Sequence, residues 1–146
     1  MTQRTASIDV GAQFSSTAGR AVTEEEIAAF ADLTGDRHPI HVDPRFAAET
    51  PFGEPVAHGL LVMSLAVGML PPEVTHRFIM RRVRDVVFRA PVKVGEEIHV
   101  DAKVASARTL SPEVELFELK LRVRGADGKA VLTGNLEAML APWEAD

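Results

Sequence analysis

The sequence predicts an α+β domain in which an antiparallel sheet is wrapped around one long buried helix. Three observations lead to this prediction. Helix-start signals occupy the first half of the chain, an apolar segment before a Pro pair covers residues 57–70, and strand-like segments fill the rest. At 146 residues the chain suits a single domain, residues 1–146, with a substantial core. We find no repeat, low-complexity segment or linker that would divide it.

The first half of the chain contains a clear helix signal. Thr23 and Glu26 have the spacing of a capping box, in which each side chain bonds the backbone of the other residue. Periodic apolar residues follow, and Gly35 is expected to end the helix. The other elements expected here are a weak strand within residues 11–20, a short helix over residues 44–48 and a turn-rich loop over residues 50–55.

The segment 57–70 is apolar nearly all round, which is typical of a helix that is buried on every side. At ~1.5 Å per residue it would be about 21 Å long, enough to form the axis of a small domain. The segment is shorter than the roughly 17–25 apolar residues of a membrane span, so we expect no membrane insertion.

After the Pro pair the hydrophobic period changes to two. In residues 98–105 and 117–124, apolar residues alternate with mostly polar ones, which predicts strands with one buried face. Asp127 and Gly128 mark a hairpin turn. The expected strands cover residues 82–90, 97–107, 113–124 and 130–141, and we expect them to form an antiparallel meander.

Composition excludes several classes of protein. Lys and Arg number 16 against 21 Asp and Glu, and this net charge of −5 argues against a general nucleic-acid binder. The absence of Cys excludes a disulfide scaffold, a thiolate metal site and a Cys nucleophile. The first five residues show no apolar stretch behind a basic one, so we expect no signal peptide and a cytoplasmic protein.

The residues best suited to chemistry follow the first helix signal. Asp36, His38 and His41 fall within six positions, in a segment that Gly35 and Pro39 keep out of a helix. An acid beside an imidazole suits proton transfer, because His titrates near neutral pH and a carboxylate can fix its tautomer. A loop Asp that makes turn hydrogen bonds and a His satisfied within the structure would give the same local pattern.

The start of the apolar segment is a second candidate. Gly59 would lie in the first turn of the helix, where backbone N–H groups have no intrahelical partner. Glycine has no Cβ to keep a ligand away, and such donors can stabilise a developing oxyanion. Close packing against the helix would equally explain a glycine at this position.

Three stretches of the chain resemble one known motif. They are residues 30–43 (FADLTGDRHPIHVD), Phe52-Gly53 and Ala57-His58-Gly59-Leu60. Together they are similar to the hydratase-2 motif of the MaoC-like (R)-specific enoyl-CoA hydratases. The resemblance covers essentially the whole chain in element order. It implies the hot-dog fold, in which an antiparallel sheet wraps a long helix and two copies pair as a homodimer.

The resemblance also implies a reaction and the residues that carry it. The family adds water reversibly to a trans-2-enoyl thioester, which gives an (R)-3-hydroxyacyl thioester, and acts as a dehydratase in reverse. Asp36 and His41 match the catalytic acid and histidine, and Gly59 matches the glycine whose N–H binds the thioester oxygen. No metal or redox cofactor is implied. The acyl group would arrive on coenzyme A or on an acyl carrier protein.

One position departs from the family pattern. The family usually has Asn where this chain has His38, and an imidazole can titrate whereas an amide cannot. We expect His38 either to line the substrate site or to be a tolerated replacement. Phe52, Gly53, His58 and Leu61 are expected to line the substrate site, and His58 also to position the loop at the helix start.

A basic cluster lies between residues 77 and 93. Simple alternation would place Arg82 and Arg84 on one strand face, with Arg81 and Arg89 on the other. Arg82 and Arg84 could contact coenzyme A phosphates or the acidic helix of an acyl carrier protein. A charged edge strand that resists aggregation would look the same. The members of the cluster are Arg77, Arg81, Arg82, Arg84, Arg89 and Lys93.

The sequence therefore predicts an enoyl-thioester hydratase or 3-hydroxyacyl-thioester dehydratase. Two alternatives remain. One is a hot-dog thioesterase, which would release a free thiol. The other is a non-catalytic hot dog, either the structural subunit of a heterodimeric dehydratase or an acyl-thioester binding module.

Overall fold

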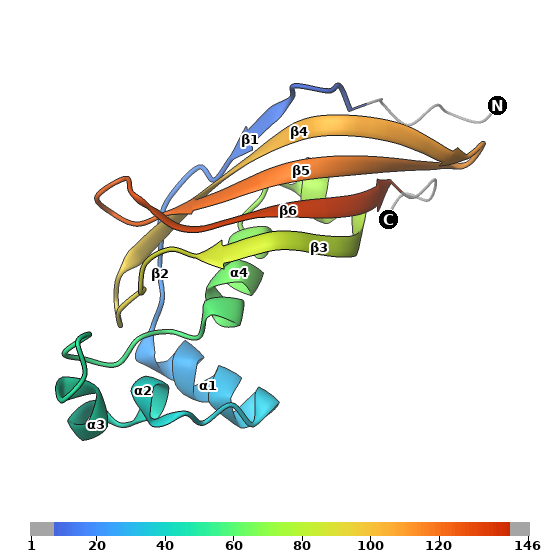
Figure 1. Ribbon diagram of the computed structural model, residues 1–146. Helices are drawn as coiled ribbons and strands as arrows, with labels where there is room; N and C mark the ends of the chain where they lie inside the picture. Colours follow the sequence, from blue (N-terminus) through green and yellow to red (C-terminus); the bar gives the residue numbers. More distant parts are fainter. Residues whose placement is uncertain (1–7, 141–146) are drawn as a thin grey trace.

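A curved antiparallel sheet wraps around helix α4 (Gly59–Gly68), while the three helices within residues 24–48 gather at one end of the molecule (Figure 1). The structure is a computed structural model that describes residues 8–140, and it confirms the α+β architecture. The N-terminal residues and Ala141 lie outside the described residues, so the signal-peptide and last-strand expectations there stay predictions. In chain order the elements are β1 (Gln13–Ser15), β2 (Arg20–Ala21), α1 (Glu24–Thr34), α2 (Pro39–Val42), α3 (Pro44–Ala48), α4 (Gly59–Gly68), α5 (Pro72–Thr75), β3 (Phe78–Phe88), β4 (Glu97–Ser111), β5 (Val114–Arg124) and β6 (Ala130–Leu140).

Helix α1 begins and ends where the sequence predicts. Thr23 Oγ1 accepts from Glu26 N at 3.2 Å, and Glu26 Oε2 accepts from Thr23 N at 3.1 Å. Gly35 ends the helix in the left-handed conformation with φ 80°. The short helix α3 is also confirmed, with Asp43 as its N-cap. These caps fix both ends of the segment that carries the first motif.

Helix α4 is shorter and more exposed than predicted. It spans ten residues, about 15 Å at the usual rise, rather than residues 57–70. Leu60 is 62% exposed, and Ser64 and Gly68, one and two turns further along, are exposed as well. The expectation of burial on every side is therefore wrong, because the sheet covers only one side of the helix. The buried residues of α4 are Leu61, Val62, Met63 and Ala66. None of the helices within residues 8–140 is long and apolar enough to cross a membrane.

The strand order in the sheet is β1-β4-β5-β6-β3, with β2 also pairing with β4. Strands β4, β5 and β6 form the predicted meander, but β3 lies beside β6 at the far edge, so the four-strand meander is wrong at that strand. Residues 89–96 connect β3, at one edge, to β4, on the far side of β5 and β6. Along the way Val92 O accepts from Ala57 N and Gly95 N donates to Val22 O, each at 2.7 Å.

The predicted alternation in β4 and β5 is confirmed. Its inward residues form the centre of the core, and each is at most 3% exposed. The weak strand expected within residues 11–20 is present as the two short strands β1 and β2, which both pair with β4 and so add to the sheet at its outer side. The inward residues of β4 and β5 are Ile98, Val100, Ala102, Val104, Phe117, Leu119, Leu121 and Val123.

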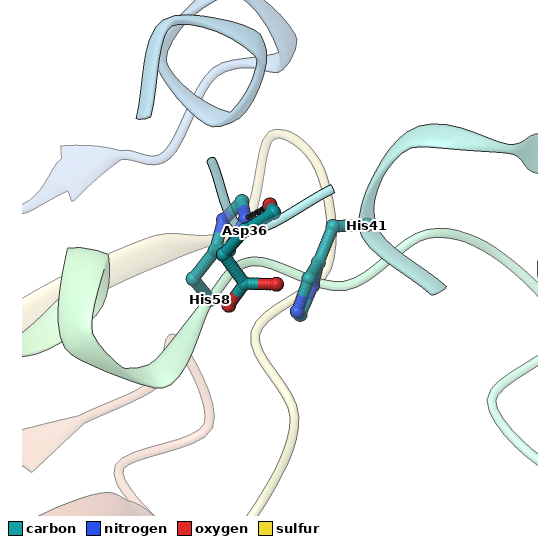
Figure 2. Close-up of side chains that lie close together, drawn as sticks. All are labelled: Asp36, His41 and His58. Carbon is teal, nitrogen blue, oxygen red and sulfur yellow. Dashed lines mark hydrogen bonds between the residues drawn. The ribbon is translucent and has the colours of Figure 1, made fainter. Parts of the chain in front are cut away.

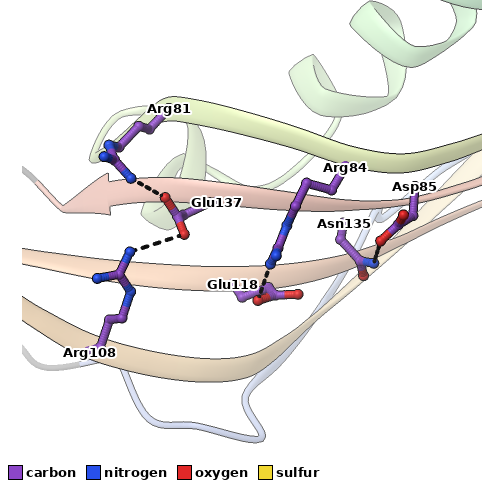
Figure 3. Close-up of polar contacts among 7 residues, drawn as sticks. All are labelled: Arg81, Arg84, Asp85, Arg108, Glu118, Asn135 and Glu137. Atoms are coloured by element: carbon purple, nitrogen blue, oxygen red, sulfur yellow. Dashed lines mark hydrogen bonds and ion pairs between the residues drawn. The ribbon is translucent and has the colours of Figure 1, made fainter.

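Strand β3 contains two β-bulges, and the first overturns the predicted faces of the arginines. Arg81 is an extra residue in the pairing with β6. Its Nη1 donates to Glu137 Oε1 at 2.5 Å, and Glu137 pairs directly with Arg82. Figure 3 shows Arg81 and Arg108 on either side of Glu137. Arg81 thus reaches the same face as Arg82 and Arg84, because alternation does not continue through a bulge.

The second bulge turns the end of β3 toward α4. Asp85 and Val86 together lie opposite Gly134, and Asp85 has φ 53°, which is uncommon for a residue other than glycine. The Asp85 carboxylate accepts from Asn135 Nδ2 at 3.3 Å (Figure 3). Beyond the bulge, Phe88 lies on the α4 side of the sheet with its ring against Gly59, although the side chain is 53% exposed. Its position at the end of β3 makes it part of the site described below.

Candidate active site

One cavity of about 470 Å³ brings the two sequence motifs together beside the N-terminus of α4. Its lining includes Asp36, His41, Phe52, His58 and Gly59, which the sequence analysis had singled out. The volume is in the range of small-molecule sites. The rest of the lining is mostly apolar and consists of Val56, Ala57, Leu60, Val62, Phe88, Arg89, Ala90, Pro91, Val92, Val131 and Leu132.

His41 lies in α2 and is half-buried. Its Nδ1 is 2.6 Å from the carbonyl oxygen of Val56 and donates to it, so the neutral ring carries its lone pair on Nε2. Burial lowers the pKa of His41, and His58 and His38 lower it further, against the opposing effects of the Val56 bond and Asp36. At neutral pH the ring is therefore a neutral hydrogen-bond acceptor.

Asp36 follows the glycine that ends α1, and its side chain faces His41 (Figure 2). Asp36, His41 and His58 each offer an atom within 4.8 Å of the others. No direct hydrogen bond joins the side chains of Asp36 and His41 among the described contacts. Two acceptors at such a spacing can hold the two protons of one water molecule.

His58 is 2% exposed and holds this arrangement together. Its Nε2 donates to the backbone oxygen of Asp36 at 2.9 Å. Its ring stacks on His41 with centroids 3.9 Å apart, and Phe30 contacts it at 4.8 Å. Its Nδ1 is buried and has no partner within residues 8–140. This is the placement expected of a residue that positions the loop at the helix start.

The same three side chains do not suit a metal ion. The rings of His41 and His58 are 27° from parallel, so lone pairs in the two ring planes cannot meet at one ion about 2 Å from each nitrogen. The geometry favours acid–base chemistry.

The N-terminus of α4 presents free backbone donors to the cavity. No side chain caps this helix, and its first N–H groups have no intrahelical partner. A Cβ on Gly59 would lie 2.5 Å from the ring of Phe88, so a larger residue there would displace that ring. Both interpretations of Gly59 therefore apply: the residue is tightly packed, and its backbone lines the cavity.

Three of the expected substrate contacts do not line the cavity. His38 instead caps α2, since its Nδ1 accepts from Ile40 N at 3.1 Å. An Asn oxygen can cap a helix in the same way, which gives the departure from the family pattern a structural explanation. Gly53 lies in the loop with φ 74°, and Leu61 is buried in the core.

The arginines of the basic cluster lie partly on the outer face of the sheet and partly at the cavity. Arg84 Nη2 donates to Glu118 Oε2 at 2.6 Å, and Arg82 lines a separate hollow on the outer face of the sheet. Arg89 instead lines the cavity, and its Nε donates to Thr133 Oγ1 at 2.8 Å. Arg89 is thus the member of the basic cluster that lines the cavity, and it differs from Arg82 and Arg84, which were expected to contact the substrate carrier.

Sequence reasoning missed Phe88 as well as Arg89. Alternation from Arg84 would have placed Phe88 on the outer face, and only the bulge at Asp85 turns it inward. The hydrophobic run at the end of β3 was the one available signal. It indicates a strand but not which side chain reaches the helix.

A curved sheet around one helix, with a carboxylate, two imidazoles and free backbone donors at the start of that helix, defines a hot-dog protein. Comparison with known proteins then gives the family. The family model described as "MaoC like domain" matches residues 6–123, and the chain belongs to this family.

Relatives and solved structures agree with this assignment. An (R)-specific enoyl-CoA hydratase from Aeromonas caviae is 35% identical over 109 residues, which are 75% of this chain and 79% of that protein. A solved (R)-hydratase from A. caviae superposes with a TM-score of 0.78 at 31% identity, covering 93% of this chain and 99% of the other. A Mycobacterium tuberculosis protein described as a double hot-dog fold gives a TM-score of 0.81 at 23% identity, over 95% of this chain and 45% of that one. This last likeness concerns the fold alone.

Proposed function

We propose that this chain catalyses the reversible addition of water to trans-2-enoyl thioesters, forming (R)-3-hydroxyacyl thioesters. The observation that carries the proposal is the meeting of Asp36, His41 and the start of α4 in one cavity. Similarity to an (R)-specific enoyl-CoA hydratase supports it. The reaction needs a base for water, an acid for C2 and donors for the thioester oxygen, and the cavity contains each.

One water molecule donates hydrogen bonds to both acceptors. His41 Nε2 accepts one of these bonds, because Nδ1 is occupied by the bond to Val56. The Asp36 carboxylate accepts the other. As the water oxygen bonds to C3, its proton passes to Nε2, and the neutral state of His41 at physiological pH leaves that lone pair available.

The electron pair of the C2=C3 bond moves toward the thioester carbonyl as the new C–O bond forms. Backbone N–H groups at the start of α4, with Gly59 first, stabilise the resulting enolate oxygen. The proton that left water is then delivered to C2, and the carbonyl reforms. Water is thus added across the double bond with no net change in the protonation of the protein. Dehydration follows the same steps in reverse.

A panel of trans-2-enoyl thioesters tests the proposal, with absorbance of the conjugated thioester as the readout. We expect the absorbance to fall with crotonyl or longer chains on coenzyme A or a carrier protein. Asp36→Asn and His41→Ala should each lower kcat by about 10²–10⁴-fold while Tm changes little. Wild-type protein that consumes no enoyl thioester on either carrier would refute the proposal. Release of free thiol in place of hydration would favour a thioesterase.

We also propose that the active form is a homodimer. Strand β3 lies at the edge of the sheet, and its side chains Ile79, Met80 and Val83 are each more than 40% exposed. A long apolar edge strand is normally paired or covered. Light scattering should give twice the chain mass, and Val83→Lys should shift the protein toward monomer. A monomeric wild type would contradict this assembly, and a second hot-dog chain purified with it would indicate a heterodimer.

A further inference from the structure

The outer face of the sheet carries a row of basic side chains that the proposed reaction does not use. Arg89, Arg122, Lys120 and Lys103 form this row, and we call it the basic strip. Thr133, which accepts a hydrogen bond from Arg89, pairs in register with Arg122. Lys120, two residues along the same strand face, pairs with Lys103. The basic strip therefore begins at the cavity and crosses β6, β5 and β4.

Two members of the basic strip repel each other. Lys103 and Lys120 are direct cross-strand partners, and both are exposed. Like charges in this relationship destabilise a sheet. Neither lysine forms an ion pair with any residue in the described range. Their positive charge is thus available to an external anion.

An acidic pair on the same face is arranged in the opposite way. Glu118 and Glu137 are also direct cross-strand partners. Arg84 binds Glu118, while Arg81 and Arg108 bind Glu137 (Figure 3). The hydrogen bond from Arg81 holds the pKa of Glu137 below its usual value. The sheet face therefore neutralises its acids internally and leaves the lysine pair uncompensated.

We infer that the basic strip docks the acidic surface of a carrier protein, whose tethered thioester enters the cavity. This inference rests on the proposed function. The two lysines are direct partners on neighbouring strands, about 5 Å apart, so a single helix about 10 Å in diameter can contact both. The phosphate that joins the tether to its carrier would then meet Arg89 at the cavity.

The charge of the whole chain favours a compact partner. At a net charge of −5 the chain repels an extended polyanion such as nucleic acid or an anionic bilayer. An acidic helix is different, because charges farther than about 8 Å are largely screened at physiological ionic strength. Such a helix on the basic strip experiences mainly the local positive charge.

Kinetics with one enoyl group on two carriers test the inference. With crotonyl on an acyl carrier protein, Lys103→Glu or Lys120→Glu should raise KM about tenfold, while KM for crotonyl-CoA changes less than about twofold. Each single substitution also creates an opposite-charge pair across the strands, so Tm should hold or rise. Loss of the fold therefore cannot explain the expected result.

A matched pair of neutral substitutions separates docking from net charge. Lys103→Gln should raise KM for the carrier substrate, whereas Arg82→Gln, which removes one charge from the same face outside the basic strip, should not. Equal effects of the two, or equal KM increases on both carriers, would overturn the inference. So would stronger binding of the wild type to vesicles of anionic phospholipid than to the carrier protein.

Fluorescence anisotropy of the labelled carrier protein measures docking without turnover. Binding that weakens in Lys103→Glu supports the basic strip even if the chain hydrates no thioester. Wild-type turnover of crotonyl-CoA without binding of the carrier protein would overturn the inference and leave the proposed function intact.

Discussion

The ring of His58 stacks on the ring of His41, with 3.9 Å between their centroids, while its Nε2 bonds the backbone oxygen of Asp36. One buried side chain therefore sets the positions of both residues that we propose to handle water. His58 lies behind the reacting groups, so its contribution is to their geometry and to the proton affinity of His41.

Replacing His58 by Phe should separate these contributions. Phe keeps a ring against His41 but loses the bond to Asp36 O, so kcat should fall by about 10–100-fold through misplacement of the loop. The pKa of His41 should rise, because His58 contributes to lowering it. The acid limb of the pH–rate profile should therefore move to higher pH. Unchanged kcat together with an unchanged acid limb would show that His58 only fills space.

The wild-type pH dependence follows from the burial of His41. Burial lowers its pKa below the ordinary value of 6.5. A base is active when deprotonated, so kcat/KM should fall as pH drops through that lowered pKa. We expect an acid-limb inflection below pH 6.5, measured by enoyl absorbance in constant-ionic-strength buffers. An inflection at or above that value would contradict the assignment of His41 as the base.

Gly59 and Phe88 should be energetically coupled. Gly59→Ala places a Cβ against the Phe88 ring and should destabilise the fold by about 1–3 kcal/mol, the usual cost of overpacking. Phe88→Ala should remove most of that penalty, which gives a coupling energy of at least about 1 kcal/mol in a double-mutant cycle. Urea unfolding of the four proteins measures it. Additive effects would mean that the ring moves away without cost.

The conformation of Asp85 predicts an order of stabilities. Its φ of 53° suits Gly and Asn better than a β-branched residue. Asp85→Asn should change the free energy of unfolding by less than about 0.5 kcal/mol, whereas Asp85→Val should lower it by about 1–3 kcal/mol. Thermal and urea unfolding provide the comparison. A Val variant as stable as the Asn variant would show that the bulge relaxes.

Local signals in the sequence were sufficient for much of the fold. The capping box at Thr23, the stop at Gly35 and the alternation in β4 each depend on neighbours close in the chain. The motif likewise indicated that Asp36, His41 and Gly59 belong to one site, and all three line one cavity. These features need no knowledge of which strand pairs with which.

Features set by distant pairing could not be predicted. The bulges in β3 exist only in relation to β6, so the face of Arg81 and the inward turn of Phe88 followed from no local pattern. The exposed side of α4, with Leu60, Ser64 and Gly68, also depends on distant packing. A segment that is apolar all round does not reveal which of its sides the sheet covers. The capping role of His38 required the position of Ile40 N.

The bulge at Asp85 also bears on how the chain tolerates changes in length. Two residues there oppose the single residue Gly134, so at this bulge, as at Arg81, β3 holds one residue beyond what its pairing with β6 needs. Deletion of that surplus residue would leave Phe88 opposite Leu132 and Val87 opposite Thr133, as now. Deletion a few positions further along would exchange the inward and outward side chains. Gaps between homologous chains should therefore gather at the bulge, where the cavity wall survives the loss of a residue.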